Sequence, residues 1–292
     1  MTNKSFFKKY PMLTYYVLTF AISWGGILMM IGLDGILGSK EISAEVMPFV
    51  YLATLLGPSI AGLLLTGLVD GKAGFRDLTA RLFKWRVGVR WYAIALLTVP
   101  FLIVTVLFVL SRTSQVFLPA ISTTDDKVSL LLTGIVTGLL VSFFEELGWT
   151  GFVVPKLRQR FGVLNTGLIV GFLWGAWHFP LFAGSISSSG SINPSIYLCV
   201  LLFSFLPAYR VLMVWAYDHT KSLLVTILMH VPLTASQLIL IPSGISRGQV
   251  VTYDLIFASA LWIVVAVIAV VKSRSLLIRT DHKQVVEVNT KA

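Results

Sequence analysis

Long apolar runs recur along the chain, each about as long as a helix must be to cross a lipid bilayer. A hydrocarbon core of about 30 Å requires roughly 20 residues at about 1.5 Å of helical rise per residue. Eight runs meet this requirement, at 12–32, 46–69, 91–111, 128–155, 164–184, 195–217, 223–242 and 253–271. Because lipid cannot satisfy backbone polar groups, these runs predict an all-α polytopic membrane protein of about eight transmembrane helices.

The composition and charge agree with a membrane protein. Hydrophobic residues make up 56% of the 292 residues and charged residues 12%, and the mean hydropathy is +0.86. A net charge of +10 would by itself suit nucleic acid. With the N-terminus inside, however, eighteen of the 23 Lys and Arg residues fall on the cytoplasmic side and four outside, leaving Arg210 within a span. We therefore expect two cytoplasmic termini, contact with anionic lipid in the bilayer, and no nucleic-acid partner.

No soluble domain interrupts the spans. Residues 1–272 are predicted to form one transmembrane bundle with a chemically active core at about 128–240, followed by a polar cytoplasmic tail at 273–292. The longest polar connection, 70–90, fits a basic interfacial helix and a plain charged loop equally well. The single cysteine, Cys199, excludes an intramolecular disulfide and any CxxC metal site.

Four side chains within the spans are of the kind that bilayer physics selects against. They are Glu145 and Glu146 in the fourth run, His178 in the fifth and His230 in the seventh. Counted from the cytoplasmic ends, Glu145, His178 and His230 lie roughly 15, 21 and 11 Å deep at helical rise. We therefore expect them to meet in one cavity near the middle of the bundle.

Carboxylates and imidazoles in one cavity predict hydrolytic chemistry. A buried carboxylate can act as the general base that activates water, and an imidazole can position that water or shuttle its proton. Adjacent residues on a helix diverge by about 100°, so one glutamate is expected to do chemistry and the other to support it. A second histidine can donate to the oxyanion of a cleaved amide, and Thr234, one turn after His230, presents a further donor.

Two other kinds of site stay open from the residues alone. A catalytic zinc would take Glu145, His178 and His230 as its ligands, although the HExxH spacing is absent. A transporter would use the same residues as a proton relay, but the chain lacks a visible repeat pair. Gly167, Gly171 and Gly175 form a smooth helix ridge, which we interpret as packing against another helix.

Three sequence blocks resemble the motifs of the CAAX prenyl protease type 2 family, also called CPBP or Abi intramembrane proteases. The blocks are EELGWTGFVVPKL, GFLWGAWHFPLF and YRVLMVWAYDHTKSLLVTILMH, within residues 128–240. The resemblance implies that Glu145 activates water with help from His178, that His230 stabilises the oxyanion, and that Glu146 is an auxiliary acid. Trp174 fills the aromatic position before His178, where the family often has Phe.

The chain departs from the family pattern at two positions. Thr150 stands where the first motif has Arg, which removes a partner for a carboxylate. Thr234 stands where the third motif has Asn or Asp, which weakens oxyanion donation. Arg210 either compensates by pairing with Glu146, or instead snorkels or binds backbone carbonyls.

The resemblance implies an intramembrane endopeptidase that hydrolyses a peptide bond of a C-terminal or membrane-anchored substrate with Glu/His-activated water. We expect a multi-pass protein of the bacterial cell membrane whose partners are a peptide or anchored-protein substrate and the bilayer. No cofactor is required by the residues, and zinc is the one metal to test. The alternative is a non-catalytic protein of the same fold that acts in bacteriocin immunity or as a scaffold.

Overall fold

The computed structural model describes residues 3–184 and 192–289, with side chains described over 6–184 and 192–271. Every regular element in this part of the chain is helical, which confirms the predicted fold class. The elements are α1 (Asn3–Lys9), α2 (Pro11–Ile36), α3 (Met47–Leu65), η1 (Thr66–Asp70), α4 (Gly71–Leu82), α5 (Val89–Ser111), η2 (Gln115–Phe117), α6 (Ala120–Thr123), α7 (Lys127–Gly148), η3 (Trp149–Val153), α8 (Val154–Leu157), α9 (Val163–Trp177), α10 (Phe179–Phe182), α11 (Pro194–Phe203), α12 (Leu206–Thr220), α13 (Leu223–Leu240) and α14 (Arg247–Asn289).

Seven helical stretches in the described part are long and apolar enough to cross a membrane. The fifth predicted span, 164–184, instead contains the shorter α9, of 15 residues, and the four-residue α10. At helical rise α9 covers only about 22 Å, less than a hydrocarbon core of about 30 Å. The eight expected spans are therefore seven long stretches and one short helix, and His178 lies at the end of the short one.

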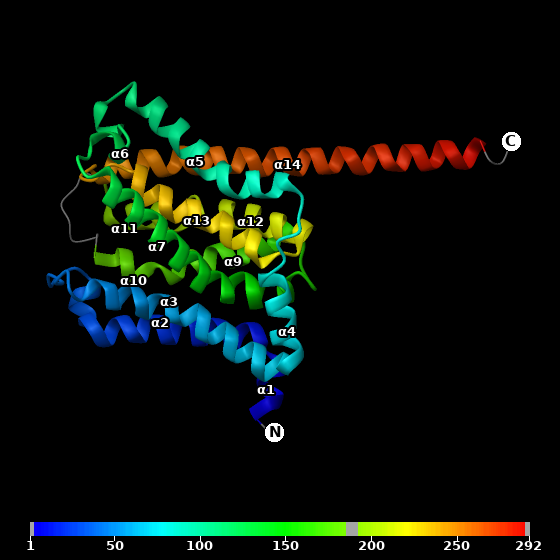
Figure 1. Cartoon of the computed structure of the whole chain (residues 1–292), viewed down its shortest axis with the longest axis horizontal. Helices are drawn as coiled ribbons and strands as arrows, with labels where there is room; N and C mark the ends of the chain where they lie inside the picture. The colour runs from blue at the N-terminus through cyan, green and yellow to red at the C-terminus, as the bar shows by residue number, and fades with distance from the viewer. Residues whose placement is uncertain (1–2, 185–191, 290–292) are drawn as a thin grey trace.

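Large apolar side chains remain exposed along the outer helices, as lipid-facing residues do. On α5, Phe101 and Phe108 are 70% and 63% exposed, and Leu132 on α7 is 60% exposed. Figure 1 shows the long helices side by side, with α1, α4 and the far end of α14 at one end of the bundle and α6 at the other. Which membrane face each end meets stays a prediction.

The glycine ridge of α9 packs against α12 and the end of α11. A Cβ atom on Gly167 would lie 2.5 Å from the Cα of Val211, and one on Gly175 would lie 2.1 Å from the carbonyl oxygen of Leu202. Side chains at these positions would collide with backbone, so the ridge permits the close helix contact that small residues allow in membranes. This contact brings α9, which His178 directly follows, beside the helix that carries Arg210.

The helix that carries the two glutamates changes its hydrogen bonding just after them. Pro155 has no backbone N–H and cannot bond to the carbonyl of Gly151 four residues earlier. Residues Trp149–Val153 form the π-helical turn η3 at this point, and the guanidinium of Arg81 on α4 donates to Gly151 O at 2.9 Å. The carbonyl freed by the proline is thus satisfied from a neighbouring helix.

Residues 70–90, which the sequence left open between helix and loop, contain α4 followed by a non-helical connection. At the other end of the chain, the backbone of α14 continues as helix through 273–289 of the predicted tail. The side chains of that tail lie outside the described residues.

Candidate active site

Glu146 is the centre of a buried polar cluster that joins three helices and the turn η3. The side chain is completely buried. Its Oε1 lies 2.9 Å from Nη1 of Arg210 on α12 and 2.9 Å from Nδ1 of His230 on α13. Its Oε2 accepts from Nη1 of Arg210 at 3.0 Å and from the hydroxyl of Thr150, one helical turn away. Glu146 therefore has three partners, one of them a fixed cation.

Arg210 pairs with Glu146, which decides between the two arrangements that the sequence left open for it. The guanidinium is 0% exposed, and its Cζ lies 4.1 Å from the centre of the Trp174 ring. A buried cation requires a charged or hydrogen-bonded partner, and stacking on an indole face adds a cation–π contact. The positive charge that Thr150 does not supply thus comes from α12.

Glu145, the neighbouring acid, faces different surroundings. Its side chain is 2% exposed, and Oε2 accepts from Nε1 of Trp174 at 2.6 Å. No described residue donates a hydrogen bond to its other oxygen, Oε1. Because adjacent helical residues point about 100° apart, the two carboxylates have separate partners. Glu146 is held as a charge-paired group, and Glu145 retains an oxygen that can bind another molecule.

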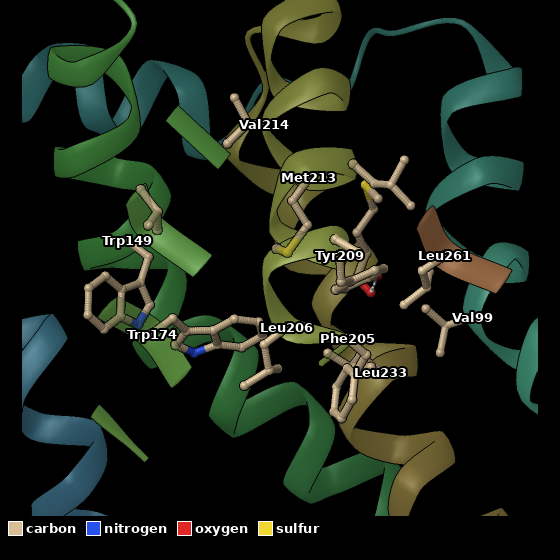
Figure 2. Close-up of a cluster of buried hydrophobic side chains, with 14 of the residues drawn as sticks. Val99, Trp149, Trp174, Phe205, Leu206, Tyr209, Met213, Val214, Leu233 and Leu261 are labelled. Carbon is tan, nitrogen blue, oxygen red and sulfur yellow. Dashed lines mark hydrogen bonds between the residues drawn. The ribbon is translucent and has the colours of Figure 1, made fainter. Parts of the chain in front are cut away.

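Trp174 connects the parts of the site. Its indole N–H bonds to Glu145, its ring lies under Arg210, and its ring centre is 5.2 Å from that of His230 in an edge-to-face contact. Figure 2 shows Trp174 beside Trp149, with Tyr209 and Met213 of α12 in the same buried cluster. From the sequence, Trp174 was identified only as the aromatic residue that precedes His178 in the second motif. The signal for its contacts was its polar N–H in an otherwise apolar run, because a buried indole N–H usually has a hydrogen-bond partner.

His178 attaches to the same tryptophan through the backbone. Its Nδ1 lies 2.8 Å from the carbonyl oxygen of Trp174. A carbonyl can only accept, so Nδ1 carries the proton and, in the neutral ring, Nε2 has a free lone pair. His178 is half-buried at the end of α9, with its ring edge-on to Trp177 at 4.8 Å. It therefore presents an acceptor nitrogen with no bond to any described residue.

The structure groups His230 with Glu146 and leaves Thr234 apart. His230 is 2% exposed, and its Nδ1 bonds to Oε1 of Glu146. Thr234 is half-buried one turn later on α13, and no hydrogen bond among the described residues joins it to the cluster. Asp254 on α14, which is 3% exposed, is a further buried carboxyl, and its place in the apolar run 253–271 was the signal for it.

The proposed zinc ligands do not converge as a metal site. The hydrogen bonds of Glu145, His178 and His230 use Oε2, Nδ1 and Nδ1, so the fit depends on whether their remaining atoms converge. Among the residues that the structure describes, no group of three or more His, Cys, Asp or Glu side chains is placed to hold a metal ion. The side chains present do not fit a bound zinc, and we derive no step through one.

The fold and the buried cluster define a multi-pass integral membrane protein with buried carboxylate, guanidinium and imidazole groups inside the bundle. Comparison with known proteins shows which family within this class the chain resembles. Residues 127–235 match the family model of type II CAAX prenyl endopeptidase Rce1-like proteins. The chain is also 24% identical over 237 residues to CAAX prenyl protease 2 of Methanococcus maripaludis, covering 78% of this chain and 84% of that protein. The resemblance predicted from the three sequence blocks is confirmed, and it supports a protease.

Proposed function

We propose that this chain is an intramembrane endopeptidase that hydrolyses a peptide bond of a membrane-associated or C-terminal peptide, using water activated by Glu145 and His178. The observation that carries the proposal is that the two glutamates have different numbers of hydrogen-bond partners. Glu146 is bonded to Arg210, His230 and Thr150, whereas Glu145 is bonded to Trp174 alone. A general base needs a free oxygen, which Glu145 has.

Glu145 and His178 can share one water molecule. Both are fixed by Trp174, one through the indole and the other through the carbonyl. Oε1 of Glu145 and Nε2 of His178 are acceptors, so each can take one of the two hydrogen bonds that the water donates. The water oxygen then attacks the peptide carbonyl carbon while Glu145 removes a proton. When the C–N bond breaks, that proton passes to the leaving amine.

His230 is proposed to stabilise the oxyanion. Its Nδ1 donates to the Glu146 carboxylate, so its Nε2 can donate as well only when the ring carries both protons. The doubly protonated ring is a cation, which suits an oxygen that gains negative charge during attack. Thr234 can add a hydroxyl donor from the next turn of α13.

Glu146 is proposed to be a positioning residue. It orients His230 through Nδ1, and Arg210 balances its charge. This division leaves Glu145 for chemistry and Glu146 for support.

The test is cleavage of a prenylated CAAX peptide by the purified full-length protein in lipid vesicles, with the products identified by mass spectrometry. Glu145→Gln and His178→Ala should each reduce the rate at least 100-fold at unchanged protein level. His219→Ala is the matched control, because Nδ1 of His219 also lies 2.8 Å from a carbonyl four residues earlier, but on an exposed residue. Full activity in both site variants would rule out the proposed roles.

A second candidate is a non-catalytic protein of the same fold, acting in immunity to a bacteriocin or as a scaffold. The observation that favours it is the half-buried Thr234, which is not bonded to the cluster and stands at an oxyanion-donor position. A Glu145→Gln protein that preserves the cellular phenotype would support this function over the enzyme. We place either protein in the bacterial cell membrane.

A further inference from the structure

One surface at the end of the bundle combines exposed basic and aromatic side chains. It covers α4 and the connection to α5. We define the α4 surface by Lys72, Phe75, Arg76, Phe83, Lys84, Trp85, Arg86 and Arg90, all of them exposed. Phe83 and Trp85 are 73% and 62% exposed, which is high for side chains of this size.

The positive charge of the α4 surface is not balanced by the protein. Asp77 is the one acidic residue in the stretch 71–92, and it pairs with Arg81 at 2.8 Å. Asp70, just before α4, pairs with Lys156 at 2.8 Å. None of the five basic residues of the surface forms an ion pair with a described residue, although Arg86 lies 5.1 Å from the centre of the Trp85 ring. The surface therefore presents cations to whatever lies outside it.

The direction of α4 fits a surface that lies along the membrane plane. Figure 1 shows α4 running across the ends of the long helices rather than parallel to them. Leu78 on its inner side is 4% exposed and packs in a cluster with Leu147 and Leu223. A helix that buries one side on a bundle and presents basic and aromatic residues at the membrane boundary has the pattern of an interfacial helix.

Hydrogen bonds also join α4 to the turn beside the candidate site. Arg81, on the inner side of α4, donates to Gly151 O at 2.9 Å and to the hydroxyl of Tyr217 at 3.1 Å. Gly151 belongs to η3, the turn that begins three residues after Glu146. α4 thus lies between the outer surface and the turn that presents Thr150 to Glu146.

We propose that the α4 surface is a binding site for anionic lipid headgroups. Lys84, Arg86 and Arg90 contact the phosphate groups, and Phe83 and Trp85 lie among the glycerol and upper acyl-chain groups. Charge complementarity identifies the partner, because phosphate-bearing lipids supply the negative charge that the protein lacks here. Exposed aromatic rings fit the bilayer boundary better than they fit a soluble acidic protein. The proposal does not depend on protease activity.

The experiment measures Trp85 fluorescence in the full-length protein reconstituted into phosphatidylcholine vesicles. Two vesicle preparations contain the same mole fraction of a lipid that carries bromine on its upper acyl chain as a quencher. The brominated lipid is phosphatidylglycerol in one preparation and phosphatidylcholine in the other. Trp85→Phe subtracts the contribution of the other tryptophans. We expect brominated phosphatidylglycerol to quench the Trp85 signal at least twofold more than brominated phosphatidylcholine, and 0.5 M salt to reduce the difference.

Charge variants make the test specific. The triple variant Lys84→Gln, Arg86→Gln and Arg90→Gln should abolish the preference for phosphatidylglycerol. The matched control removes three exposed charges at the other end of the bundle, by Lys40→Gln, Arg112→Gln and Lys127→Gln, and should retain the preference. Equal quenching by the two lipids would overturn the proposal and leave an acidic protein as the partner. If the two triple variants lost the preference for phosphatidylglycerol equally, net charge would explain the preference. That result would also overturn the proposal.

Discussion

Nη1 of Arg210 lies 2.9 Å from Oε1 and 3.0 Å from Oε2 of Glu146, so one nitrogen on α12 holds both carboxylate oxygens on α7. Both side chains are completely buried. A buried pair adds little net stability compared with an apolar pair, but breaking it is costly because one charge is left without its partner. The contact therefore fixes how α7 and α12 sit against each other, and it fixes the acid that orients His230.

Arg210→Met should destabilise the protein by about 3–5 kcal/mol, because Glu146 is left charged and buried without its cation. Unfolding in detergent measures the change. The double variant Arg210→Met, Glu146→Gln should recover part of the loss, since no unpaired charge then remains. Arg158→Met breaks the half-buried pair with Asp218 and should cost only about 1 kcal/mol. Equal losses of stability in the two arginine variants would contradict the assignment of Arg210 as the buried counter-charge of Glu146.

Thr150→Val should destabilise by about 1.5–3 kcal/mol, because it removes a buried hydrogen bond to a charged carboxylate while nearly keeping the side-chain shape. Thr226→Val is the control. Thr226 is equally buried, but its hydroxyl donates to the neutral carbonyl of Leu223 at 2.8 Å. That variant should cost about 1 kcal/mol, and chemical unfolding compares the two. A smaller loss at Thr150 than at Thr226 would show that the hydroxyl does not support Glu146.

Trp174→Phe should lower kcat by about tenfold and leave KM nearly unchanged, because it removes the N–H that positions Glu145 and keeps an aromatic ring beside Arg210. Peptide cleavage in vesicles gives both constants. The matched variant is Trp177→Phe, because the indole N–H of Trp177 is buried without a hydrogen-bond partner among the described residues. Its kcat should stay within twofold of the unchanged protein. An equal fall in both variants would assign the effect to packing.

Gly148→Ala should disrupt the site without removing any polar group. A Cβ at this position would lie 2.2 Å from the carbonyl oxygen of Pro58 and 2.3 Å from the hydroxyl of Tyr15. Separating α7 from α2 and α3 to relieve these contacts should cost about 3 kcal/mol or more. Gly162→Ala, with no neighbouring atom within 4 Å, should change stability by less than about 0.5 kcal/mol. Thermal unfolding of both variants tests this, and unchanged stability in Gly148→Ala would refute the close packing.

The positions of the spans and the buried acids were predictable because both signals are local. Apolar length marks a helix that crosses the bilayer, and Glu145 and Glu146 stand out against apolar neighbours. Thr150 was noted only as a missing arginine. Its place one turn after Glu146 was a local signal for the hydrogen bond that the structure contains.

Contacts between helices were harder to predict, because they depend on how each helix is rotated about its axis. The sequence left Arg210 open between a carboxylate and the backbone, and it did not place His230 on the same acid. The length of α9 was overestimated because hydropathy continues through Phe182, whereas the helix ends at Trp177. Pro180, just beyond, lacks the N–H that a continuous helix would use.

The buried pair of Arg210 and Glu146 also limits how related sequences can change. Since the loss of either charge alone leaves the other buried without a partner, substitutions at the two positions should occur together among relatives. An arginine at the position of Thr150 would supply the same cation from η3, the turn that follows α7. We therefore expect relatives with arginine there to vary at the α12 position, and relatives with threonine there to keep the arginine of α12.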